Sequence, residues 1–322
     1  MKNKKLNTIF LETLNKRFPN RSELADILAD LLDTDKTSIY RRLREDVRFS
    51  VDELGSIAKR FAISLDELID NVRERDYKTM KLEMPFITDE NGIIYDLLEE
   101  QLFCSEKFVN GEDSELGAAL GILNRAFFIH YDQLARFFLF KWGRYYTDLN
   151  DFKRFETVEI NDRFKALQRI EGESLQRFKN TFYIWDIRII PNLVRDIKYY
   201  ESIDLINSTD TQLLRDDLFQ LLDDLEAQVA QGRYQETGNH FEFYTASMNI
   251  HTTHTYMHSG DHWVYFLNAF VVRSMYTVDP LVCARMKNWI NTQKASSVLI
   301  SESGEKERLQ FFNKQRQVVE ML

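Results

Sequence analysis

The segment from Lys36 to Arg44 carries four cations and no acidic side chain. Lysine and arginine bind phosphate oxygens, and arginine also pairs with guanine through two hydrogen bonds. Threonine and tyrosine contact phosphates or a thymine methyl group, and serine can bind a phosphate or a base edge. These residue types at this spacing predict contacts with the major groove of double-stranded DNA from six side chains: Lys36, Thr37, Ser38, Tyr40, Arg41 and Arg44.

Such side chains need a helix that turns one face outward. Asp35 suits the N-cap of that helix, because its carboxylate can accept hydrogen bonds from the first backbone amides. Ile39 and Leu43 lie four residues apart, so they share its inner face. A preceding helix should end near Leu32, with the next two residues in a tight turn. Residues 28–44 therefore predict a helix, a turn and a second helix.

This stretch, LADLLDTDKTSIYRRLR, resembles the helix-turn-helix of phage-repressor or Cro-like transcription regulators, the xenobiotic-response-element type. The shared features are a small residue in the first helix (Ala29), an apolar residue at its end (Leu32), a capping residue (Asp35) and the apolar pair of the second helix. Residues 48–69 are similar to the last two helices of such domains. The family usually has glycine where this chain has Asp33, a residue type that tolerates a left-handed backbone better than most.

The resemblance covers about the first 75 residues and implies a compact domain of five helices that binds duplex DNA. The apolar spacing from Leu6 to Phe18 predicts its first helix, which Pro19 ends. Two capping boxes predict its last two helices: Ser50 with Glu53, and Ser64 with Glu67. A helical bundle with a solvated basic face is the alternative interpretation.

Length and charge divide the chain into two parts. The 322 residues, 44% hydrophobic and 13% aromatic, suffice for two domains. We expect a DNA-binding domain over residues 1–75, a linker over 76–92 and a second region over 93–322. The first 75 residues carry 15 basic and 14 acidic side chains, against 27 and 37 in the remainder. Attraction to DNA must therefore come from a local patch, and non-specific binding should be modest at physiological salt.

The number of cysteines and the lengths of the apolar segments indicate the cellular compartment. Two cysteines, Cys104 and Cys283, are too few for a disulfide framework or a cysteine-based zinc site, and indicate reduced thiols in a cytoplasm. Polar residues interrupt the first 18 positions, so we expect no signal peptide there. No run of about 18 apolar residues occurs, which predicts no membrane span.

The second region reads as mostly helical. The aromatic-rich stretch from Phe127 to Tyr146 fits a buried helix or the wall of a ligand pocket. A helix over residues 209–231 carries a stripe of leucines, which either packs on its own domain or forms a dimer contact: Leu214, Leu218, Leu221, Leu222 and Leu225. The paired acids on this helix are expected on a solvated face.

Residues 241–277 change the pattern to loose alternation of aromatic, β-branched and polar residues, with a Ser259-Gly260-Asp261 turn. This predicts a β-hairpin, a small antiparallel sheet. Asp279 followed by Pro280 predicts a helix, and Ser303 a last one. The expected fold class is α+β, mostly α, with the five-helix domain followed by a helical region, the hairpin and two C-terminal helices.

Four histidines have the spacing H-x2-H-x3-H-x3-H: His251, His254, His258 and His262. On a continuous helix they would share one face and could bind a metal ion. The neighbouring threonines favour strands instead, on which His254 and His258 share a face while His251 points away. We therefore interpret them as sheet residues, with a metal site as the less favoured alternative.

The leading hypothesis is a bacterial-type, cytoplasmic transcription regulator that binds double-stranded DNA as a homodimer and is not an enzyme. The second region would supply dimerisation and a response to an unknown small-molecule or peptide effector. No phosphate loop, nucleophile turn or H-E-x-x-H motif occurs in the sequence, and no cofactor is expected. Two alternatives stay open: an enzyme or metal-binding protein that uses the segment His251–His262, with the N-terminus as a docking module, and a protein-interaction scaffold.

Overall fold

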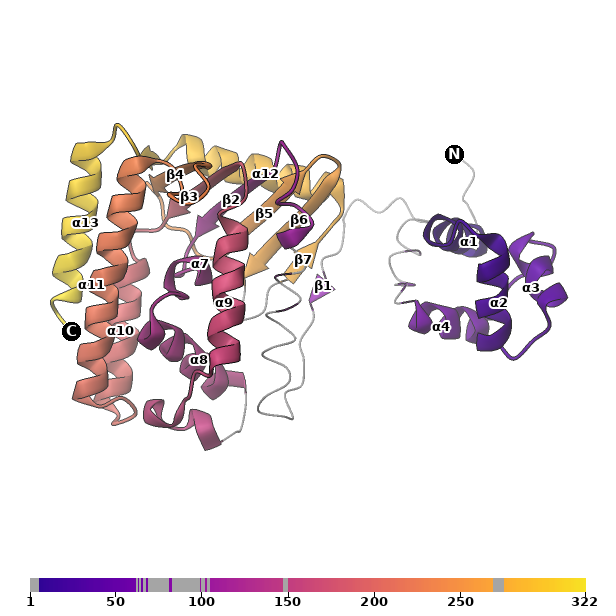
Figure 1. Ribbon diagram of the computed structural model, residues 1–322, viewed down its shortest axis with the longest axis horizontal. Helices are drawn as coiled ribbons and strands as arrows, with labels where there is room; N and C mark the ends of the chain where they lie inside the picture. The colour runs from indigo at the N-terminus through magenta and orange to yellow at the C-terminus, as the bar shows by residue number, and fades with distance from the viewer. Residues whose placement is uncertain are drawn as a thin grey trace. The chain divides into compact units, whose positions relative to one another are not determined.

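The computed structural model describes residues 6–61, 63, 65, 68, 81–82, 99, 102, 105–146, 150–268 and 275–322. The chain forms two compact units, Met1–Thr79 and Met80–Leu322 (Figure 1). None of the described helices is long and apolar enough to cross a membrane.

The first unit has four described helices around one apolar core: α1 (Leu6–Arg17), α2 (Arg21–Leu31), α3 (Lys36–Leu43) and α4 (Val51–Arg60). Phe10, Leu24, Ile39 and Ile57 contribute one fully buried side chain from each helix. Most of the predicted fifth helix, including its capping pair Ser64 and Glu67, lies outside the described residues. So does most of the segment predicted as linker, in which Lys81–Leu82 forms strand β1.

The second unit is built on one mixed sheet, which has eight strands among the described residues, in the order β1-β7-β6-β5-β2-β3-β4-β8. Strands β2, β3 and β4 are parallel, and the other pairings are antiparallel. The strands after β1 are β2 (Glu115–Leu120), β3 (Asn180–Trp185), β4 (His240–Thr245), β5 (Thr253–Ser259), β6 (His262–Asn268), β7 (Met275–Thr277) and β8 (Val298–Leu299).

The predicted fold class is therefore wrong: the second unit is a larger α/β structure, not a helical region with a small hairpin. Strands β5 and β6 do pair across the Ser259–Asp261 turn, but β4 lies apart from them, beside β3. Strands β2 and β3 were missed because they are buried on both faces, so their sequences ELGAAL and NTFYIW show no alternation. Short apolar runs of this kind cannot be told from helix by periodicity.

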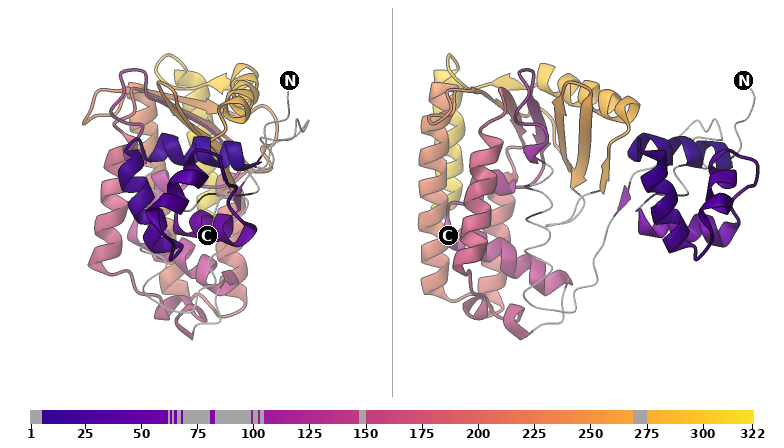
Figure 2. Two further views of the ribbon diagram at one scale, coloured as in Figure 1. Left: turned by 90° about the vertical axis from the view of Figure 1, so that its right-hand side faces the viewer. Right: turned by 45° about the vertical axis from the view of Figure 1, so that its right-hand side comes forward.

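Helices cover both faces of the sheet (Figures 1 and 2). Trp185 and Phe243 pack on one side in the main core, with α8, α10, α11 and α13. Phe182 and Ile184 pack on the other side, against α12. The described helices of this unit are α7 (Arg125–Phe128), α8 (Asp132–Tyr146), α9 (Asp162–Leu175), α10 (Ile189–Ser202), α11 (Ser208–Gln231), α12 (Pro280–Ala295) and α13 (Glu305–Val319), with 3-10 turns η1 (Asn150–Phe152) and η2 (Phe155–Thr157).

The leucine stripe of α11 is part of this core. All five leucines from Leu214 to Leu225 are buried within the unit's own main cluster. Phe137, Phe140 and Trp142 of α8 are buried in the same cluster. The stripe is therefore not a dimer contact, and these three α8 aromatics are core residues.

The prediction of a solvated face for the paired acids of α11 holds for Asp216, Asp223 and Asp224, which are exposed, but not for Asp217, which is half-buried. Asp217 accepts hydrogen bonds from the backbone amides of Gln133 (2.8 Å) and Leu134 (3.1 Å), and so caps the first turn of α8. Burial raises the pKa of Asp217 above its ordinary value, although these hydrogen bonds oppose the shift. The neighbouring Asp224 accepts a hydrogen bond of 2.8 Å from the Tyr131 hydroxyl.

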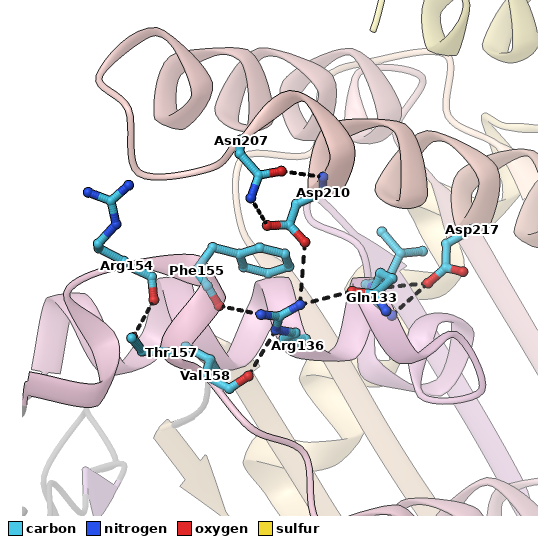
Figure 3. Close-up of polar contacts among 10 residues, drawn as sticks. Gln133, Arg136, Arg154, Phe155, Thr157, Val158, Asn207, Asp210 and Asp217 are labelled. Carbon is cyan, nitrogen blue, oxygen red and sulfur yellow. Dashed lines mark hydrogen bonds and ion pairs between the residues drawn. The ribbon is translucent and has the colours of Figure 1, made fainter.

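Arg136 of α8 joins three elements of the second unit (Figure 3). Its guanidinium donates to the backbone oxygens of Val158 and Phe155, each at 2.9 Å, and to Gln133 Oε1 at 3.3 Å. It also lies 3.5 Å from the Asp210 carboxylate at the start of α11 and 4.2 Å from the Phe155 ring centroid. One half-buried cation thus holds α8, η2 and α11 together.

Replacing Arg136 by Ala should lower the free energy of unfolding by about 3–5 kcal/mol, because two carbonyl oxygens and the Asp210 carboxylate lose their cation. Arg154 is the matched control: its side chain points away from this cluster in Figure 3 and forms an exposed ion pair with Glu156. Arg154→Ala should change stability by less than about 0.5 kcal/mol. Urea unfolding at unchanged m-value measures both, and equal effects would contradict the role of Arg136.

Candidate nucleic-acid interface

The turn between α2 and α3 forms without glycine. Helix α2 ends at its C-cap Leu32, and Asp33 follows with φ of +46°, in the left-handed region. The backbone amide of Thr34 then donates to the Ala29 carbonyl at 3.1 Å. Asp33 therefore adopts the conformation that the family resemblance assigns to glycine, as its tolerance for a left-handed backbone allows.

Asp35 begins α3 as the predicted N-cap. Its carboxylate accepts hydrogen bonds from the Ser38 amide at 2.9 Å and from the Ser38 hydroxyl at 2.7 Å. These two bonds from Ser38 hold the pKa of Asp35 below its ordinary value. The Ser38 hydroxyl is thus engaged in capping the helix, which makes it the weakest of the six predicted DNA contacts.

The buried face of α3 fixes which residues point outward. Ile39 and Leu43 are buried among residues of α2, including Leu24, Ala25 and Leu28. The predicted contact residues consequently lie on the accessible side: Lys36, Thr37, Arg41 and Arg44 are exposed, whereas Ser38 and Tyr40 are half-buried.

The four cations of this segment differ in their partners. Lys36 forms an exposed ion pair with Asp26 of α2, and the hydrogen bond and charge of Asp26 raise the pKa of Lys36. Arg42 is turned inward and binds Glu53 of α4 at 2.7 Å. Among the described residues, no carboxylate lies within ion-pair distance of Arg41 or Arg44. Two guanidinium groups are therefore available to an anionic partner, and an exposed pair such as that of Lys36 costs little to open.

The structure adds Arg21, which the sequence did not single out, to this surface. Arg21 begins α2, is exposed, and its guanidinium donates to the Leu43 carbonyl at 2.5 Å. A cation of α2 is thereby held at the end of α3. The Asn20 side chain caps the start of α2, because it accepts hydrogen bonds from the amides of Ser22 and Glu23. In the sequence, an N-cap asparagine followed directly by arginine is the signal that could have identified Arg21.

The four candidate histidines lie along strands rather than on one helix. His251 precedes β5, His254 and His258 lie on β5, and His262 begins β6. Both ring nitrogens of His254 have partners, with Tyr265 Oη at 2.6 Å and Thr252 Oγ1 at 2.8 Å.

The His258 ring packs on Trp263, with centroids 3.8 Å apart. Within the described part of the chain, no group of three or more His, Cys, Asp or Glu residues is placed to hold a metal ion. The geometry therefore gives the metal-site alternative no support.

The left-handed backbone at Asp33 makes a substitution test possible. Asp33→Gly should keep or slightly raise stability, whereas Asp33→Ala should lower it by about 1 kcal/mol, because a Cβ without a local hydrogen-bonding group is disfavoured there. Asp30→Ala, at an exposed position inside α2, is the control and should be neutral or stabilising. Hydrogen exchange of the α2 and α3 amides in the full chain measures these changes. Loss of protection in Asp33→Gly as large as in Asp33→Ala would contradict the assigned turn.

Comparisons with known proteins found no relative of this chain. No protein-family model, curated protein or solved structure matches the chain. The functional assignment of α3 therefore depends on its own residues and their geometry.

Proposed function

We propose that this chain is a sequence-specific, double-stranded-DNA-binding transcription regulator of the cytoplasm. In this proposal α3 enters the major groove, and residues 80–322 hold two DNA-reading units together and respond to an effector. The observation that carries the proposal is the outer face of α3, where Arg41 and Arg44 have no acidic partner among the described residues and stand beside Thr37 and Tyr40.

The chemistry of that face suits base reading. A guanidinium group can donate two hydrogen bonds to O6 and N7 of one guanine, which discriminates against other bases by about 1–3 kcal/mol. Thr37 and Tyr40 offer hydroxyl groups for phosphates, and the Thr37 methyl can contact thymine. A helix fits the major groove, whose width is about 12 Å.

Charge favours two reading units over one. The first 75 residues are nearly neutral and the remainder carries ten more acidic than basic side chains. General attraction to phosphates is therefore weak, and a single α3 spans only about one half-site. Pairing makes the second contact effectively intramolecular and so raises affinity. Since the leucine stripe of α11 is buried in its own core, the pairing surface must lie elsewhere.

Arg41→Ala and Arg44→Ala should each weaken binding to a selected duplex about 5–150-fold, the equivalent of one lost bidentate contact. Lys16→Ala removes an exposed cation from the last turn of α1 and should change affinity less than about twofold. Fluorescence anisotropy titrations at one salt concentration compare the variants. Unchanged affinity in the Arg41→Ala, Arg44→Ala double variant would refute the role of α3.

The full chain should sediment at about twice its 38.3 kDa monomer mass at micromolar concentration. Sedimentation equilibrium with and without a selected duplex measures this directly. A protein that stays monomeric in both conditions would refute the pairing role and leave an effector response as the function proposed for residues 80–322.

A further inference from the structure

Glu53 serves two structural roles at once. It completes the capping box of α4, because its Oε2 accepts from the Ser50 amide at 2.7 Å while its own amide donates to Ser50 Oγ at 3.2 Å. Its other carboxylate oxygen, Oε1, accepts from Arg42 Nη2 of α3 at 2.7 Å. The start of α4 is thus tied directly to α3.

This ion pair is largely shielded from solvent. The side chains of Arg42 and Glu53 are only 19% and 20% exposed. Arg42 Nη1 also donates to the Ser38 carbonyl at 3.3 Å. Burial opposes the charge of Glu53, but hydrogen bonds from Ser50 and Arg42 hold its pKa below the ordinary value. Arg42 therefore stabilises the packing of α3 and is not presented to a ligand.

Hydrogen bonds to Arg41 and Tyr40, on the outer face of α3, hold the backbone that leads from α3 to α4. The amide of Asp46 donates to the Arg41 carbonyl at 2.9 Å, and the Arg44 amide donates to the Tyr40 carbonyl at 3.1 Å. Glu45 adopts a left-handed conformation, with φ of +67°. A change in the position of α4 would therefore be transmitted to Arg41 and Arg44 through this short connection.

We propose that Arg42 and Glu53 are positioning residues that set the orientation of Arg41 and Arg44 toward DNA. The inference rests on the proposed DNA-reading function and names no contact of either residue with DNA. In this proposal Arg41 and Arg44 bind DNA, whereas Arg42 holds α3 in place.

A pure charge effect and a positioning role predict opposite changes in DNA affinity for Glu53→Gln. Removing an acid close to α3 strengthens binding to a polyanion if charge alone matters. Glutamine also preserves the capping box, so α4 keeps its start. The positioning role instead predicts at least about fivefold weaker binding to a selected duplex, the lower limit for one lost bidentate contact. Asp52→Asn, an exposed acid one residue earlier, is the matched control and should bind equally or more tightly.

Arg42→Gln should weaken specific binding to a similar extent while keeping the wild-type dependence of affinity on salt, because no phosphate contact is lost. A lost phosphate contact would instead reduce the slope of log K against log salt by about 0.9. The Arg42→Gln, Glu53→Gln double variant should lose no more affinity than either single variant. Arg42→Lys, which keeps the charge, should recover part of the affinity. If circular dichroism shows that Arg42→Gln is unfolded, Arg42→Lys replaces it in these measurements.

Three results would overturn the inference: Glu53→Gln binding as tightly as the wild-type chain or more tightly, a reduced salt slope in Arg42→Gln, or additive losses in the double variant. Each leaves the proposed DNA-reading function intact. A wild-type chain with no preference among duplexes would instead refute that function, before any variant is compared.

Discussion

The burial of Ile39 and Leu43 is the constraint on which the proposed DNA-reading surface depends. Both side chains are almost fully buried, in one apolar cluster with Leu24, Ala25 and Leu28 of α2. Burying two such side chains contributes about 3–6 kcal/mol before entropy is counted. With this face fixed, the 3.6-residue period places Thr37, Arg41 and Arg44 on the opposite side.

Ion pairs then distribute the charges of the chain between structure and function. Asp26 and Glu53 neutralise two of the four cations of residues 36–44, and only Arg41 and Arg44 are left without an acid among described residues. In the second unit, several acids that give this region its negative charge cap or pair with neighbouring elements, as Asp217 does with α8. The acidic total is thus in part a consequence of packing.

The first unit could be predicted well from sequence because its signals are local. Apolar spacing and capping residues lie within a few positions of the helices that they define, and Asp35 and Ser50 cap α3 and α4 where expected. The pair of Arg42 and Glu53 could not be predicted, since it joins two helices whose relative placement no local pattern encodes. Lys36 was expected to be available to DNA, and its partner Asp26 was missed for the same reason.

The sheet of the second unit was missed for a different reason. Alternation reveals a strand only when one of its faces is solvated, and β3 has Phe182 and Ile184 buried on one side and Tyr183 and Trp185 on the other. The segment from residue 241 was recognised as strand, but pairing between β4 and β3 depends on a crossover through α10 and α11. Such long-range pairing is fixed by the whole core, which periodicity cannot report.

Selection of bound sequences from a pool of random duplexes, with the full-length chain, is the direct test of whether α3 reads DNA. We expect that one motif is enriched, that it is lost when Arg41 and Arg44 are both replaced by Ala, and that two copies recur about one helical turn apart, roughly 34 Å. A pool that remains random after repeated rounds, under conditions where the chain is folded, would contradict the assignment of α3 as a DNA-reading helix.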